Sequence, residues 1–261
     1  MSSNSSPQNK DEMVGAEQPF VAHLIELRDR LIRAIIGVGI VGIALAIWPG
    51  PTALYDFLAK PMVDVYLNGG ISIRPIDPFF VPLKVLLMAA LVIALPFVLY
   101  QAWAFIAPGL YRKEKMLVLP LVISSTLLFF VGMAFCYYFV FNKVFTFIMH
   151  FAPESIQVMP DINEYLSFVL TMFLAFGLAF EVPVVVVVLV RLGVVSVEKL
   201  KANRGYVIVG TFVIAAIVTP PDVISQLALA IPMCILYELG ILVSKMIKPK
   251  TDEEEQSSAA P

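Results

Sequence analysis

Charged residues are scarce in this chain. They make up 15% of its 261 residues, whereas soluble globular domains have about 25%. The 18 Lys and Arg and the 20 Asp and Glu leave a formal net charge of -2. The sequence therefore lacks the basic footprint of a nucleic-acid-binding protein, and we exclude nucleic acid as a partner.

Cysteine and histidine are also rare, with only Cys136, Cys234, His23 and His150. These are too few for a Cys/His metal site or a disulfide framework. Both cysteines lie in apolar runs, which predicts small buried thiols. The sequence has no HExxH, no GxSxG and no Gly-rich phosphate loop. We expect no enzymatic activity and no cofactor, so energy for any work must come from a partner or from the proton-motive force.

Apolar residues are abundant instead. They make up 59% of the chain, and the mean hydropathy of +0.87 indicates a polytopic membrane protein. About 20 apolar residues are needed to cross the hydrocarbon core as a helix. We predict an all-α fold with six transmembrane helices in a concave arrangement, and the hairpin of the last two, of which the fifth is short and the sixth is broken by Pro232, is expected in locally thinned bilayer. The six apolar runs are 34–48, 85–107, 116–142, 165–190, 205–219 and 223–243.

The cations are distributed unevenly between the two sides of these runs. Fourteen flank one side, and only Lys60, Arg74, Lys84 and Lys143 flank the other. The positive-inside rule then predicts that both termini and the loops near 108–115 and 192–204 are cytoplasmic. Residues 49–80, 143–164 and 219–222 are expected outside. The polar ends 1–18 and 247–261 are predicted to be disordered tails around a membrane domain at 19–246.

One further helix is predicted in the outer segment. Residues 52–66 carry apolar side chains at helical spacing, which favours an amphipathic helix along the outer interface. Its apolar residues are Leu54, Tyr55, Leu58, Met62 and Val65.

Three polar residues lie within or close to the apolar runs. Glu181 is deep in the fourth run, where an ionised group costs about 2.5–3.5 kcal/mol, so it is a candidate functional residue. The alternative is a protonated carboxyl bonded to a neighbouring helix. Gln101 and Glu238 lie nearer the inner face, and Glu238 is best explained as an interface anchor.

Two carboxylates are predicted at the cytoplasmic face. Glu26 belongs to a segment with an apolar stripe, and its spacing to Arg30 predicts an i,i+4 salt bridge. Glu114 lies among three cations in the loop 107–115, where a solvated charge would be unremarkable. Alternatively, both carboxylates could bind guanidinium groups, because the planar arginine fork matches a carboxylate.

Four segments together resemble the signature segments of the TatC family, the polytopic core subunit of the twin-arginine protein translocase. The resemblance covers residues 19–246 in order. Its segments are HLIELRDRL at 23–31, YQAWAFIAPGLYRKEK at 100–115, SFVLTMFLAFGLAFEVP at 167–183 and VTPPDVISQLALAIPM at 218–233. One departure is the loop LYRKEK, whose cations stand in an unusual order.

The resemblance implies a receptor for twin-arginine signal peptides of folded precursor proteins. It also implies single-span TatA and TatB partners, self-association in a larger complex, use of the proton-motive force, and the cytoplasmic membrane of a bacterium. The signal-peptide surface would comprise Glu26, Arg28, Phe105 and Glu114. Pro61 and Asp222 would act on the outer side. Glu181 would face a concave membrane-embedded pocket. Gln101 is grouped with Glu181 as an intramembrane polar residue. The fifth and sixth spans would form the docking edge for the partner helices.

Two other classes of function remain open on the sequence. A proton-coupled secondary transporter would use Glu181 as its coupling carboxylate, but the two halves of the chain have no matching broken segments. A purely structural membrane scaffold would not bind a twin-arginine peptide.

Overall fold

The computed structural model describes residues 8–65, 71–106, 118–151, 161–219 and 222–246. Within these residues the helices are joined by turns, and the strand pairing consists of one isolated parallel bridge between Ile71 and Asp161. The helices are α1 (Gln8–Ile47), α2 (Pro51–Val65), α3 (Asp77–Ile106), α4 (Val118–Phe135), the π-helical η3 (Cys136–Val140), α5 (Phe141–Phe151), α6 (Ile162–Phe180), α7 (Val182–Arg191), α8 (Val197–Ala202), α9 (Arg204–Val218) and α10 (Val223–Met246).

The predicted spans are confirmed as helices. Five helical segments are long and apolar enough to cross a membrane, and α9 is shorter, with 15 residues. Helix α9 corresponds to the fifth apolar run, which was predicted to form a short span. The amphipathic helix predicted at 52–66 is α2, at Pro51–Val65.

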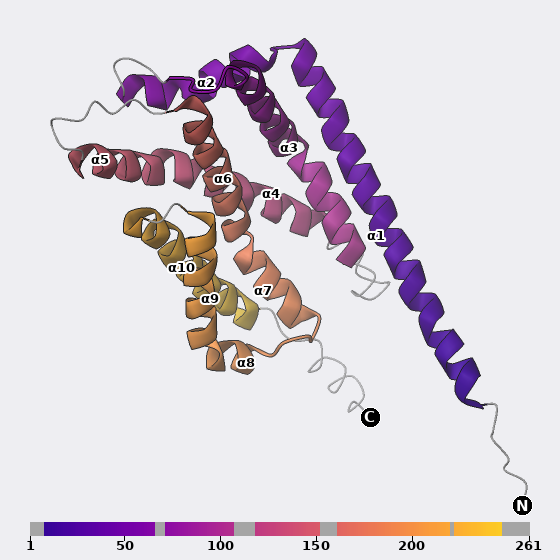
Figure 1. Ribbon diagram of the computed structural model, residues 1–261. Helices are drawn as coiled ribbons and strands as arrows, with labels where there is room; N and C mark the ends of the chain where they lie inside the picture. The colour runs from indigo at the N-terminus through magenta and orange to yellow at the C-terminus, as the bar shows by residue number, and fades with distance from the viewer. Residues whose placement is uncertain (1–7, 66–70, 107–117, 152–160, 220–221, 247–261) are drawn as a thin grey trace, which may run out of the picture.

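The chain runs up and down between two ends of the helix array. Helix α2 lies across one end, here called the α2 end, and α8 lies at the opposite α8 end (Figure 1). Helix α1 begins and α10 ends toward the α8 end. Helix α1 starts at Gln8 rather than near residue 19, so part of the segment predicted as a tail is helical. The division into tails and membrane domain otherwise stays a prediction.

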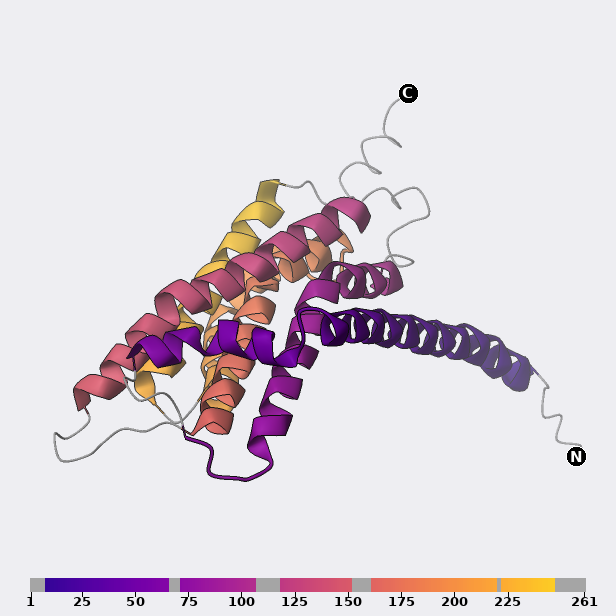
Figure 2. The ribbon, with the colours of Figure 1, turned by 90° about the horizontal axis from the view of Figure 1, so that it is seen from above.

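Two features of the long helices break their regularity. Helices α4 and α5 are joined through η3 into one rod that runs diagonally across the molecule in Figure 2. The fourth span is interrupted at Glu181, between α6 and α7, where Pro183 removes a backbone donor near the start of α7. Glu181 therefore occupies a bend rather than the middle of a straight helix.

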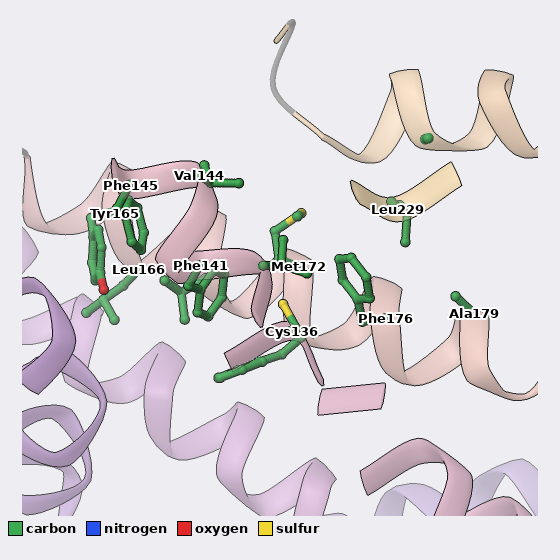
Figure 3. Close-up of a cluster of buried hydrophobic side chains, with 14 of the residues drawn as sticks. Cys136, Phe141, Val144, Phe145, Tyr165, Leu166, Met172, Phe176, Ala179 and Leu229 are labelled. Carbon is green, nitrogen blue, oxygen red and sulfur yellow. The ribbon is translucent and has the colours of Figure 1, made fainter. Parts of the chain in front are cut away.

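The main core lies where α5, α6 and η3 meet. Its largest members are aromatic and aliphatic side chains from these segments, including Phe141, Met172 and Phe176 (Figure 3). Cys136 is fully buried among them, as predicted, whereas Cys234 is only partly buried and its sulfur lies 3.3 Å from Thr211 Oγ1.

Helix α1 differs from the other spans because it packs mainly on α3. Its contact is close at Gly37, which lies against the ring of Phe97, and at Gly42, which lies against Ala90. The opposite face of α1 exposes large apolar side chains such as Ile36 and Ile43. This helix is the least enclosed part of the array, as Figure 1 shows.

Candidate functional site

The first candidate site is formed where α1 and α3 meet at the α8 end. The imidazole of His23 stacks on the ring of Phe105, with centroids 4.3 Å apart and an interplanar angle of 17°. The two residues come from different helices and lie far apart in sequence. Their stack places Phe105 beside the segment of α1 that carries Glu26, one helical turn after His23.

The carboxylate of Glu26 is held by its own helix. Its Oε1 accepts hydrogen bonds from Arg30 Nε at 2.9 Å and Nη2 at 2.6 Å. This confirms the predicted i,i+4 salt bridge. Both bonds end on Oε1, and about a third of the Glu26 side chain is exposed. The carboxylate therefore keeps accessible acceptor capacity, because each ionised oxygen has two lone-pair sites.

Arg28 points its guanidinium to the adjacent carboxylate on the same helix. Its Nη2 lies 2.8 Å from Asp29 Oδ1, and both side chains are exposed. Arg28 and Glu26 therefore lie two residues apart near the middle of α1 but have separate partners. Glu114 lies in 107–117, outside the described residues, so the structure does not place it relative to them.

The two residues expected on the outer side lie in different elements, one within α2 and one just before α10. Pro61 lies within α2, although its side chain is outside the described set. Asp222 precedes α10, and its Oδ1 accepts a hydrogen bond from the backbone N–H of Ser225 at 2.6 Å. Asp222 thus satisfies one of the free donors at the start of α10, a role that its position before an apolar run could have indicated.

The second candidate site is the bend at Glu181. The residue is 7% exposed, and neither carboxyl oxygen has a hydrogen-bond partner among the described residues. Ser125, on α4, lies near this carboxyl, because Val122 and Val184, each one helical turn from these residues, pack in one buried cluster. The indole Nε1 of Trp103, on α3, donates to Ser125 Oγ at 2.9 Å. Sequence reasoning missed Ser125 and Trp103, because nothing local connects them to Glu181.

Gln101 is also buried, but it is not brought to Glu181 by any hydrogen bond between described residues. Its Oε1 has no partner in that part of the chain. Ala90 and Phe97 of α3 contact α1, and Gln101 follows Phe97 by one helical turn on the same face. Gln101 therefore belongs to the side of α3 that faces α1.

Glu238 forms a salt bridge with a residue that its local sequence does not single out. Its carboxylate contacts Arg204, at the start of α9, with the shortest N–O distance at 2.6 Å. The neighbouring Tyr237 donates its hydroxyl to the Leu200 carbonyl of α8 at 3.0 Å. These contacts tie α10 to α8 and α9.

The face formed by α3 and α4 is hollowed. The larger cavity, of about 1380 Å³, lies beneath α2 and is lined by Leu58, Met88, Tyr137, Phe173 and other mainly apolar residues of α2 to α6. A second cavity of about 720 Å³ lies between α3 and α4. Phe130 and Ala134 line both cavities. Neither of them is lined by Glu181.

Comparisons with known proteins agree with one another. The family profile described as TatC, Sec-independent protein translocase protein, matches residues 22–232. A TatC protein of Haemophilus influenzae is 46% identical over 92% of this chain and 94% of its own length. A TatC protein of Escherichia coli K12 is 45% identical over 92% of this chain and 93% of its own. A crystal structure titled as the twin arginine translocase receptor TatC superimposes with a TM-score of 0.76 and 39% identity, covering 86% of this chain and 98% of that one.

Proposed function

This chain belongs to the TatC family of Sec-independent protein translocase proteins, multi-pass membrane components that are not enzymes, and we propose that it is the receptor for twin-arginine signal peptides. The observation that carries the proposal is the pairing of an accessible carboxylate, Glu26, with the stacked rings of His23 and Phe105, where the end of α3 meets the middle of α1.

The chemistry of this surface suits a guanidinium. A carboxylate accepts the planar fork of arginine in a charge-assisted hydrogen bond, and an aromatic face attracts the same cation. The Arg30 contact holds the Glu26 side chain in one place, which reduces the ordering cost when a peptide binds. Glu114, on the adjoining loop, is proposed as the second carboxylate, which would allow each of two successive arginines its own partner.

The proposed orientation places this surface in the cytoplasm, with the α2 end outside. Its support is the excess of Lys and Arg on the α8 side of the apolar runs. We infer that the chain works in the inner membrane of a bacterium, assembles with single-span TatA and TatB subunits and with further copies of itself, and depends on the proton-motive force. The short α9 and the adjoining α10 are the proposed docking edge for the partner helices.

Glu181 is proposed as a polar docking point for such a helix. Its carboxyl lies at a bend in the fourth span and has unused hydrogen-bonding capacity. A polar side chain on a partner span would satisfy that capacity at a gain of about 1–2 kcal/mol, which suits reversible recruitment.

Binding of a signal peptide to the purified full chain tests the receptor proposal. A twin-arginine peptide should bind more tightly than its twin-lysine counterpart. Glu26→Gln keeps the side-chain shape but removes the charge, so affinity should fall about tenfold or more, because a hydrogen bond to a charged group contributes about 1.5–3 kcal/mol. Phe105→Ala should also weaken binding, because it removes the aromatic face.

The control is Glu238→Gln, which removes one carboxylate at α10, away from the α1–α3 surface. Its affinity for the peptide should equal that of the unmodified chain. Equal affinity for the twin-arginine and twin-lysine peptides, or no loss in Glu26→Gln, would refute the receptor assignment.

A further inference from the structure

Trp103 and Ser125 form a buried polar pair between α3 and α4. The Trp103 indole N–H donates to the Ser125 hydroxyl at 2.9 Å. Ser125 is fully buried, and Trp103 is nearly so. A hydroxyl that accepts one hydrogen bond still has its own hydrogen to donate. Because no bulk water reaches Ser125, that hydrogen needs a partner within the protein.

Apolar side chains fill much of the space around the pair. Trp103 packs in an apolar cluster with Val122, Val184 and Val188. On the other side of the bend, α4 crosses α6 at Gly132 and Gly177, where aromatic rings and backbone fill the space. The cluster also brings Glu181 near the Ser125 hydroxyl, because Val122 lies one helical turn before Ser125 and Val184 one helical turn after Glu181.

In the part of the chain that the structure describes, the Glu181 carboxyl lacks hydrogen-bond donors, just as the Ser125 hydroxyl lacks an acceptor. Both oxygens of Glu181 lack a partner among the described residues, although the side chain is buried. A desolvated carboxyl without hydrogen bonds is costly. A hydrogen bond from the Ser125 hydroxyl to one Glu181 oxygen would satisfy this donor and this acceptor at once.

We propose that Ser125 and Trp103 are positioning residues for Glu181. The Trp103 indole fixes the Ser125 oxygen, and the Ser125 hydroxyl donates to one oxygen of the carboxyl, which leaves the other oxygen to accept a hydrogen bond from a partner helix that packs at the bend. The inference builds on the docking role proposed for Glu181 and adds the two residues, from two other helices, that present the group.

The chain of hydrogen bonds from Trp103 through Ser125 to Glu181, here called the relay, does not compete with docking of a partner helix. A carboxylate has two oxygens and about four lone-pair sites, so one oxygen can remain with Ser125 while the other is engaged. Holding the side chain in its bound orientation before the partner arrives lowers the ordering cost of association. Removal of the hydroxyl should therefore weaken docking even though no atom of Ser125 contacts the partner.

Infrared spectroscopy of the purified full chain in lipid nanodiscs tests the hydrogen bond directly. The Glu181 carboxyl band is identified as the band that disappears in Glu181→Gln. We expect it to shift in Ser125→Ala, and to shift in the same direction by a smaller amount in Trp103→Phe, which keeps the ring but removes the N–H. Ser124→Ala is the matched control, because Ser124 donates to the Leu121 carbonyl of its own helix at 3.0 Å. A band that stays in place in Ser125→Ala overturns the relay.

Crosslinking to a single-span partner in membranes tests the consequence. Ser125→Ala should lower crosslinking at the depth of Glu181 about fivefold, the effect of one ordinary hydrogen bond, whereas Ser124→Ala should not change it. Unchanged crosslinking in Ser125→Ala would also overturn the positioning role. Trp103→Phe supplies the same test if Ser125→Ala does not fold.

The docking role itself is tested separately by Glu181→Ala. If that variant keeps full crosslinking at this depth, the docking proposal fails whatever the infrared result. If Glu181→Ala abolishes crosslinking but the carboxyl band does not respond to Ser125, docking stands and the relay is wrong.

Discussion

Gly132 of α4 is where substitution should most directly disturb the packing of the helix array. A Cβ at this position would lie 2.5 Å from the carbonyl oxygen of Phe176 and 2.9 Å from the ring of Phe180. Ordinary van der Waals contact begins at 3.4 Å, so the new methyl group would be about 0.9 Å too close to the carbonyl oxygen. Because a backbone carbonyl cannot rotate away as a side chain can, α4 and α6 would have to separate.

The expected cost of Gly132→Ala is about 1–3 kcal/mol, the usual range for overpacking. The substitution also brings a gain of about 1 kcal/mol in helix propensity, because alanine replaces glycine. Gly39→Ala in α1 shares that gain, and its Cβ would meet nothing within 4 Å. The difference in stability between the two variants therefore isolates the cost of the clash.

Thermal unfolding of the two purified variants in the same detergent measures this difference by circular dichroism. Gly132→Ala should melt several degrees below Gly39→Ala, since 1 kcal/mol corresponds to about 2–4 °C for a chain of this size. Equal melting temperatures would show that the α4–α6 crossing is not tightly packed at this point, and the reasoning from backbone contact would be wrong.

Two further predictions concern orientation and pH. Lys250→Cys, in a chain whose own cysteines are replaced, should be labelled only from the cytoplasmic side and Lys143→Cys only from outside; outside labelling at 250 in intact cells would contradict the topology. The backbone N–H of Glu164, with those of Asn163 and Ile73, lowers the pKa of the Asp161 carboxyl below 3.8. Because the folded pKa is depressed, this stabilisation is complete above pH 3.8 and is lost as pH falls through the folded value. The melting temperature should therefore fall in that range, and Asp161→Asn should lack this part of the pH dependence; parallel curves would refute it.

Much of the fold could be predicted from the sequence because it depends on local properties. Each apolar run is long enough to form a helix whose backbone groups bond within the segment, so the spans could be located without knowing their neighbours. The same holds for α2, whose apolar face follows helical spacing, and for the bond between Glu26 and Arg30, which are four residues apart. The bend at Glu181 follows from Pro183.

The contacts that build the candidate sites were not predictable in this way. His23 meets Phe105, Trp103 meets Ser125, and Arg204 meets Glu238 only because different helices pack at particular rotations. Those rotations depend on close contacts such as Gly132 against α6, where the lack of a side chain sets how near two helices approach. Hydropathy does not contain this information, since a lipid-facing and a helix-facing apolar side chain look alike in sequence. The sequence by itself determined which segments are helices and where costly polar groups lie, whereas tertiary packing alone decided which of those groups meet.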